Sequence, residues 1–135
     1  MSLHIVILAA GQGKRMYSTK PKVLHELGGV PLLARVITTA QSLNPEAIHV
    51  IYGHGGDQIR KTLAHFSVNW ILQTEQLGTG HAVMQALPHI PPHAQVLILY
   101  GDVPLIQTDT LTTLITQAQQ HHALTLLVAK PTNPH

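Results

Sequence analysis

The chain of 135 residues contains no cysteine, and only 4% of its residues are aromatic. The lack of cysteine excludes disulfide frameworks, zinc sites built on thiolates, and thiol nucleophiles. Charged residues make up 10% of the chain, and the 8 Lys and Arg stand against 6 Asp and Glu, so the surface is not strongly basic. The small charge imbalance and the few aromatic residues argue against nucleic-acid binding.

Long apolar runs are also missing from the sequence. No stretch reaches the ~18–20 residues that a membrane-spanning helix needs. The start of the chain, Met1–Ile5, has neither the basic region nor the cleavage site of a signal peptide. We therefore expect a cytoplasmic protein without membrane contact. Hydrophobic residues still make up 44% of the chain, enough for the core of one domain, which excludes a disordered chain.

Five short apolar runs alternate with segments of helical periodicity. Nearly continuous apolar runs are typical of strands that are covered on both faces, as in a parallel sheet. The alternation of strands and helices predicts a doubly wound α/β fold, Rossmann-like in its general architecture. The predicted strands are His4–Leu8, Ile48–Tyr52, Val68–Leu72, Gln95–Tyr100 and Ala123–Ala129.

Four helices are predicted between these strands from apolar stripes and capping residues. The first follows Pro31, and Asp57 is predicted to cap the second. The third follows Gly78, and Thr108 or Asp109 is predicted to cap the fourth. The apolar stripes consist of Leu32, Leu33, Val36, Ile37 and Ala40; Ile59 and Leu63; Ala82, Val83, Ala86 and Leu87; and Leu111, Leu114, Ile115 and Ala118.

A glycine-rich segment with two cations follows the first predicted strand. Gly11 and Gly13 permit backbone conformations that let successive N–H groups face a phosphate, and Lys14 and Arg15 add positive charge. The dinucleotide fingerprint is excluded because Met16 stands where its third glycine belongs. A P-loop is excluded because it needs Ser or Thr after the lysine. On this evidence alone, a plain tight turn is the first interpretation of the segment.

The continuation of this segment changes that interpretation. The pattern Gly11-x-Gly13-x-Arg15-Met16, followed by residues 21–24 and 28–32, resembles the signature of sugar-1-phosphate nucleotidylyltransferases. Residues 72–82 and 100–105 resemble the uridine-reading segment and the metal-binding strand end of bacterial uridylyltransferases. With residues 52–57, the resemblance is strongest to the bifunctional N-acetylglucosamine-1-phosphate uridylyltransferase/glucosamine-1-phosphate acetyltransferase family. It extends from about His4 to Lys130.

The resemblance implies a reaction and a set of site residues. UTP and N-acetylglucosamine-1-phosphate would form UDP-N-acetylglucosamine, a precursor of peptidoglycan and lipopolysaccharide, and pyrophosphate, with Mg²⁺ as the cofactor. It assigns catalysis to Arg15 and Lys22, sugar binding to Tyr100, Gly101 and Asp102, and metal binding to Asp102. The implied nucleotide-binding residues are Leu8, Ala9, Ala10, Gly11, Gly13, Lys22, Gln73, Gly78 and Thr79.

Residue chemistry supports several of these roles but leaves alternatives open. Asp102 suits Mg²⁺, which prefers oxygen ligands, although an aspartate there also simply begins a loop. Lys22 would stabilise phosphate charge, or it is a solvated lysine after Pro21. The amide of Gln73 matches the O4 and N3–H groups of uracil, and Gln76 is chemically equivalent. Sugar-1-phosphate is already an anionic nucleophile, so no general base is required.

The family's uridylyltransferase domain is longer than this chain. We therefore expect residues 1–135 to be its nucleotide-binding part. The sugar-binding remainder, a second metal-binding Asn, the β-helix acetyltransferase domain and its trimer contacts would lie beyond residue 135. Lys14 departs from many members, which carry Thr or Ser there. Two alternatives remain open, namely a nucleotide-binding fragment without turnover and a nucleotidylyltransferase for another base or sugar. The eleven His, including His54 and His81, are interpreted as ordinary residues rather than as metal ligands.

The implied sheet is parallel, in the order 3-2-1-4-5 by position in the chain. The first strand is then central, and the glycine-rich loop lies at the switch point between strands one and four. Ligands bind at such a point in open α/β sheets.

Overall fold

The computed structural model describes residues 3–9, 22–53, 57–73, 79–101 and 126–129. In the described part, the strands are β1 (Leu3–Leu8), β2 (Glu26–Leu27), β3 (Val30–Pro31), β4 (Ala47–Gly53), β5 (Asn69–Gln73), β6 (Gln95–Tyr100) and β7 (Leu126–Ala129). The helices are α1 (Leu32–Gln41), α2 (Asp57–Thr62) and α3 (Thr79–Ala86), with 3₁₀ turns η1 (Lys22–Leu24) and η2 (Leu87–His89).

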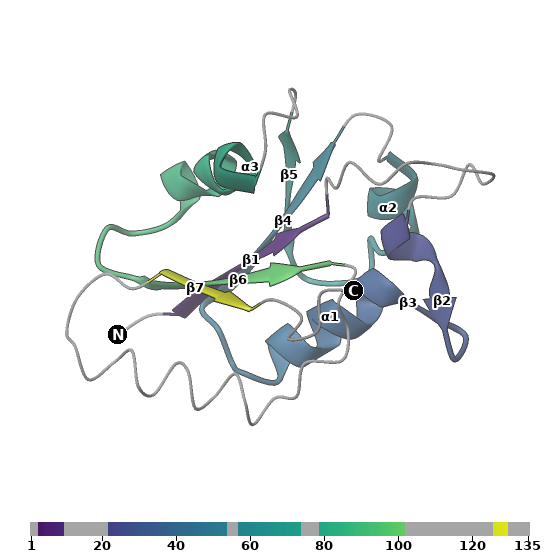
Figure 1. The fold of residues 1–135 in the computed structure, drawn as a ribbon. Helices are drawn as coiled ribbons and strands as arrows, with labels where there is room; N and C mark the ends of the chain where they lie inside the picture. The colour runs from purple at the N-terminus through teal and green to yellow at the C-terminus, as the bar shows by residue number, and fades with distance from the viewer. Residues whose placement is uncertain (1–2, 10–21, 54–56, 74–78, 102–125, 130–135) are drawn as a thin grey trace.

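Five strands form one sheet in the order β5-β4-β1-β6-β7 (Figure 1). Every neighbouring pair is parallel, and β1 lies in the centre between β4 and β6. In terms of the five predicted strands this order is 3-2-1-4-5, so the predicted topology is confirmed. The doubly wound α/β class is confirmed with it.

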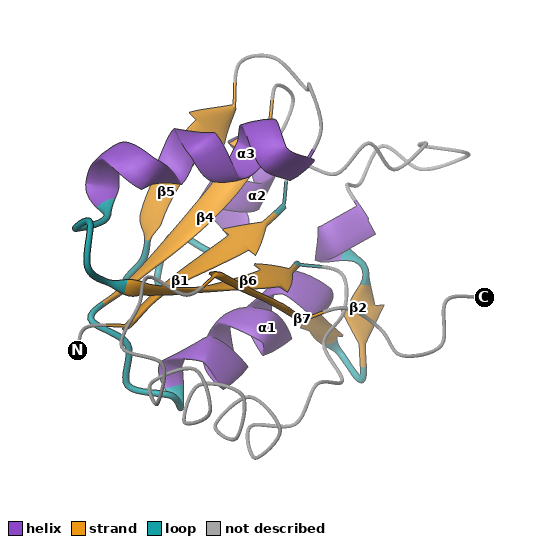
Figure 2. Ribbon diagram, turned by 60° about the vertical axis from the view of Figure 1, so that its left-hand side comes forward, coloured by secondary structure: helices purple, strands orange, loops and turns teal. Residues whose placement is uncertain are grey.

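Successive side chains of a strand point to opposite sides of the sheet. The side chains of β1 therefore pack into two separate apolar clusters, one on each face. On one face, Ile5 and Ile7 pack with residues of α1 such as Leu33 and Ile37, and with Ile59 of α2. On the other face, Val6 packs with apolar residues of α3. Figure 2 shows α1 and α3 on opposite sides of the sheet. Full burial of such a side chain contributes roughly 1.5–3 kcal/mol, so both layers stabilise the sheet.

A short hairpin connects η1 to α1, and the strand patterns did not predict it. β2 and β3 are antiparallel and are joined by Gly28 and Gly29, which have φ angles of +65° and +83°. A two-residue hairpin loop with positive φ at both positions favours glycine, because other residues adopt that conformation at a cost. Helix α1 begins immediately after the hairpin, with Pro31 as its N-cap residue. The hairpin thereby fixes η1 next to α1.

The predictions for the three helices in the described part of the chain hold with three differences. Asp57 is the first residue of α2 rather than a residue preceding it, and α2 ends at Thr62, so Leu63 of its predicted stripe lies just beyond the helix. α3 ends at Ala86, and Leu87 belongs to a 3₁₀ turn, because Pro88 has no N–H with which to continue an α-helix. The helix predicted after Thr108 or Asp109 lies outside the described residues. Within the described ranges, no helix is long and apolar enough to cross a membrane.

Candidate functional site

The carboxyl ends of β1, β4, β5 and β6 lie along one edge of the sheet, because the strands are parallel. The register pairs Leu8 at the end of β1 with Tyr100 at the end of β6. On the other side, Gly53 at the end of β4 pairs with Gln73 at the end of β5. Three predicted site segments, far apart in the sequence, therefore share the edge at which α/β proteins bind ligands.

Backbone hydrogen bonds fix the place where the chain leaves β1. The N–H of Gly101 donates to the carbonyl oxygen of Leu8 at 3.0 Å, and the N–H of Ala9 donates to the carbonyl of Ile51 at 2.8 Å. The first residues of the predicted nucleotide-binding loop are thus tied to the strands on both sides. The residue predicted to bind metal, Asp102, directly follows Gly101 in the chain.

Gly101 permits this close approach because it has no side chain. A Cβ atom there would lie 3.1 Å from the carbonyl oxygen of Leu8, 3.2 Å from Cδ1 of Leu33 and 3.3 Å from Cγ1 of Val23. The first neighbour is backbone of the central strand and cannot turn away. Gly101 is therefore a packing requirement of the sheet edge as well as a predicted sugar-binding residue.

Gln73 is buried at the end of β5, with 2% of its surface exposed. Its Nε2 lies 2.9 Å from Nδ1 of His81, which is in the first turn of α3. An amide nitrogen only donates, so Nδ1 accepts this bond and is the unprotonated ring nitrogen. The interpretation of His81 as an ordinary residue missed this contact. The available signal was its position at the start of the helix that follows the strand carrying Gln73.

The remaining predicted site residues divide into two groups. Lys22 begins η1, and the next two residues, Val23 and Leu24, are buried beside α1, so the backbone at Lys22 is anchored. Thr79 is the first residue of α3. Tyr100 is half-buried at the end of β6. Outside the described residues lie Ala10, Gly11, Gly13, Arg15, Gly78 and Asp102.

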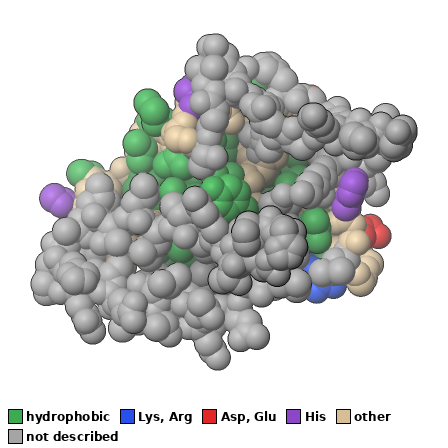
Figure 3. All heavy atoms as spheres, viewed as in Figure 1, with side chains coloured by type: hydrophobic (Ala, Val, Ile, Leu, Met, Phe, Trp, Pro, Cys, Tyr) green, Lys and Arg blue, Asp and Glu red, His purple; other side chains and the backbone are tan. Residues whose placement is uncertain are grey.

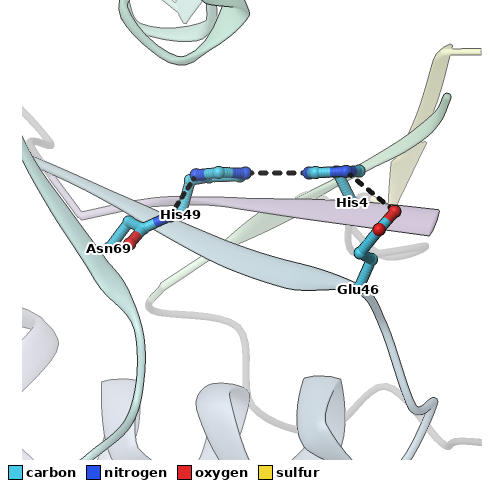
Figure 4. Close-up of polar contacts among 4 residues, drawn as sticks. All are labelled: His4, Glu46, His49 and Asn69. Atoms are coloured by element: carbon cyan, nitrogen blue, oxygen red, sulfur yellow. Dashed lines mark hydrogen bonds and ion pairs between the residues drawn. The ribbon is translucent and has the colours of Figure 1, made fainter. Parts of the chain in front are cut away.

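A second polar cluster lies near the opposite, amino-terminal edge of the sheet. His4 of β1 and His49 of β4 are buried, and their Nδ1 and Nε2 atoms lie 3.0 Å apart (Figure 4). Burial, together with the nearby His4 and His89, lowers the pKa of His49 to about 4. The cluster is remote from the ligand edge, so we assign it to stability rather than to the site. Strand patterns did not predict this pair.

Charged side chains are few on the viewed face of the described residues. Figure 3 shows mainly hydrophobic side chains there, in green, and few Lys, Arg, Asp or Glu side chains. The large apolar side chains exposed in the described ranges are Val30, Leu72, Met84 and Leu87. Among the residues whose placement the structure gives, no group of three or more His, Asp or Glu could hold a metal ion. The predicted metal ligand, Asp102, lies outside that part of the chain.

A doubly wound parallel sheet with helices on both faces defines the fold class, and solved structures share it. Rv0371c from Mycobacterium tuberculosis H37Rv superimposes with a TM-score of 0.77 at 21% identity, over 88% of this chain and 61% of that one. Its complex with manganese gives a TM-score of 0.74 at 20% identity, over 88% and 60%. At this level of identity the likeness shows the fold alone.

Sequence comparison goes one step further and gives the family. The chain belongs to the MobA-like NTP transferase domain family, which it matches over residues 5–135. It is also similar to the "Bifunctional protein GlmU" of Legionella pneumophila (strain Lens), with 62% identity over 138 residues. That match covers 99% of this chain and 30% of the relative. The resemblance inferred from the motifs is thereby confirmed, and the chain spans about 30% of the length of the curated relatives it matches.

Proposed function

We propose that residues 1–135 form the nucleotide-binding part of a uridylyltransferase. The parent enzyme joins UTP to N-acetylglucosamine-1-phosphate and releases UDP-N-acetylglucosamine and pyrophosphate. The observation that carries the proposal is the meeting of three motif segments at one sheet edge, namely Leu8 with Ala9, Gln73, and Tyr100 with Gly101. The 62% identity to a GlmU protein supports the choice of substrates.

The base and the phosphates of the nucleotide bind at two different places along this edge. The amide of Gln73 hydrogen-bonds to uracil, and Gly78 and Thr79 complete the nucleoside contacts before α3. The backbone N–H groups from Leu8 to Gly13 bind the phosphates. Because the Leu8 carbonyl and the Ala9 N–H are already bonded to neighbouring strands, this loop starts from a fixed point. Such preorganisation lowers the entropy cost of aligning the reactants.

Catalysis rests on charge stabilisation rather than on proton transfer. Attack by the sugar phosphate on the α-phosphate of UTP increases the charge on the equatorial oxygens and on the departing pyrophosphate. Arg15 and Lys22 stabilise that charge as fixed cations. The anchoring of η1 by two buried residues, Val23 and Leu24, holds the backbone of Lys22 in position.

Asp102 binds Mg²⁺ in this proposal, and Tyr100 and Gly101 contact the sugar beside it. The structure supports the fit because Gly101 is hydrogen-bonded to Leu8, so the next residue in the chain starts beside the phosphate loop. A carboxylate oxygen suits Mg²⁺. The manganese complex of Rv0371c is a further reason to expect a divalent cation. When bound, the cation would neutralise phosphate charge during transfer.

The other expectations follow from the longer relatives. The sugar-binding remainder, the acetyltransferase domain and its homotrimer contacts belong to sequence beyond this chain. The parent protein is proposed to be cytoplasmic, without nucleic-acid or membrane partners, and to supply peptidoglycan and lipopolysaccharide synthesis.

The test is pyrophosphate release from UTP and N-acetylglucosamine-1-phosphate with Mg²⁺. Release that requires both substrates and falls roughly a hundredfold in Lys22→Ala supports the full reaction. Lys61→Ala is the matched control, since Lys61 is an exposed lysine in the last turn of α2 and belongs to none of the motif segments. Its rate is expected to equal that of the unchanged chain.

One observation favours a second candidate function, because the chain covers only 30% of its relative. In that case residues 1–135 bind UTP but do not turn it over, since the sugar pocket is incomplete. Selective UTP binding without pyrophosphate release would support this candidate. Equal binding of all nucleotides would contradict both, and a preference for another base would identify a different nucleotidylyltransferase.

A further inference from the structure

The buried amide of Gln73 makes a contact whose direction affects base recognition. A carboxamide is nearly symmetrical in shape, and a half-turn about its last bond exchanges its oxygen for its NH₂ group. Uracil offers an acceptor at O4 beside a donor at N3–H. Cytosine offers the reverse, a donor at its 4-amino group and an acceptor at N3. A glutamine that is free to turn would therefore accept either pyrimidine.

His81 removes this freedom in the structure. The Nε2 atom of Gln73 faces Nδ1 of His81 at 2.9 Å, and Gln73 is 2% exposed, so water has little access to replace the contact. The NH₂ group has two hydrogens. The one that lies trans to the carbonyl oxygen can serve His81, while the other points the same way as the oxygen. One donor and one acceptor thus remain side by side, and their order stays fixed while this contact holds.

We propose that His81 is a positioning residue that holds the Gln73 amide in the orientation matching uracil and thereby disfavours cytosine. This inference rests on the proposed role of Gln73 in reading the base. It adds a residue that acts through Gln73 rather than on the nucleotide. In the opposite orientation Oε1 would face Nδ1, and a hydrogen bond would form there only if the imidazole proton moved from Nε2 to Nδ1.

Gln85 contacts the far side of the same imidazole ring. Its Nε2 donates to the backbone carbonyl of His81 at 3.2 Å and lies 3.4 Å from the ring Nε2. That ring nitrogen carries the proton in the tautomer described above, so a donor beside it works against this tautomer. Removing the Gln85 amide should therefore leave the preference for uracil intact or increase it.

The test is a calorimetric comparison of UTP and CTP binding to the 135-residue chain in the presence of Mg²⁺. In His81→Leu, the ratio of CTP to UTP dissociation constants should fall by up to about tenfold, the effect of one lost hydrogen bond. His81→Asp should retain most of the ratio because a carboxylate oxygen can take the place of Nδ1 and can only accept. His81→Leu alone can reduce binding for general reasons, but a general loss would not change this ratio.

Two control variants come from the same helix. Met84→Ala alters a side chain that is 60% exposed and should leave the ratio unchanged. Gln85→Leu should keep or raise the ratio of CTP to UTP dissociation constants. Thermal unfolding of each variant verifies that it is folded before binding is compared.

The outcomes separate this inference from the function on which it rests. An unchanged ratio in His81→Leu, with a collapsed ratio in Gln73→Leu, would overturn the role of His81 and leave uridine reading by Gln73 in place. An unchanged ratio in Gln73→Leu would overturn both. The absence of any UTP preference in the unchanged chain would overturn the proposed function itself.

Discussion

The imidazole rings of His4 and His49 meet edge to edge across β1 and β4. Their planes differ by 5°, their centroids are 5.3 Å apart, and Nδ1 of His4 lies 3.0 Å from Nε2 of His49 (Figure 4). Nδ2 of Asn69 lies 3.2 Å from Nδ1 of His49 and can donate to it. This direction gives His49 a proton on Nε2, which donates to His4. The proton of His4 is then on Nε2, 3.5 Å from the carboxylate of Glu46. Both rings are neutral in this arrangement.

Acid is expected to destabilise the fold through His49. Its pKa is about 4 in the folded chain, against an ordinary value of 6.5, because burial and the neighbouring His4 and His89 disfavour the charged form. The unfolded chain therefore takes up the proton at a higher pH. The stability is fully present above pH 6.5 and is lost as the pH falls towards 4, by about 3 kcal/mol in total.

Urea unfolding at pH 7.5, 5.5 and 4 measures this loss. Other histidines also titrate, so the informative comparison is between His49→Leu, which should show a shallower pH dependence, and His93→Gln at an exposed position, which should retain it. Identical pH dependence in all three proteins would exclude His49 as the cause.

Replacing one member of the pair should cost more than replacing both. His4→Leu leaves Nε2–H of His49 buried without its acceptor, which we expect to cost about 1–3 kcal/mol. The double variant His4→Leu/His49→Leu removes both polar rings and should recover part of that loss. A double-mutant cycle by urea unfolding gives the coupling. Strictly additive losses would show that the two rings act independently.

Two glycines, one at the sheet edge and one in α3, should respond to alanine in opposite ways. Gly101→Ala places a Cβ 3.1 Å from the carbonyl oxygen of Leu8, so we expect a loss of about 1–3 kcal/mol. Gly80→Ala in α3 meets no atom within 4 Å and should gain roughly 0.5–1 kcal/mol from helix propensity. Thermal unfolding of both variants measures the two changes in stability. Equal effects would contradict the close approach at Gly101.

Much of the fold was predictable because its signals are periodic. Continuous apolar runs marked the five strands of the sheet, and the stripe from Leu32 to Ala40 marked α1 almost to the residue. The β2–β3 hairpin was not predicted because strands of two residues are too short to show an alternation of apolar and polar side chains. Its remaining signal was the pair Gly28 and Gly29, whose positive φ angles a two-residue turn favours.

The polar contacts could not be predicted from sequence patterns, for a different reason. His4 and His49 meet only because β1 and β4 are neighbours in a particular register, which a strand pattern does not contain. The motifs placed Gln73 in the predicted site, but they did not connect it to His81, which approaches it from the next helix. The placement of the catalytic side chains Arg15 and Lys22 and of the Asp102 carboxylate stays a prediction.

The most direct test of the central claim is a calorimetric titration of the chain with UTP and with ATP, each with and without Mg²⁺. The proposed uridine site predicts that UTP binds at least about tenfold more tightly than ATP, and that Mg²⁺ strengthens binding. Equal affinity for the two nucleotides, or no binding of either, would contradict the claim that these residues form a uridine nucleotide site.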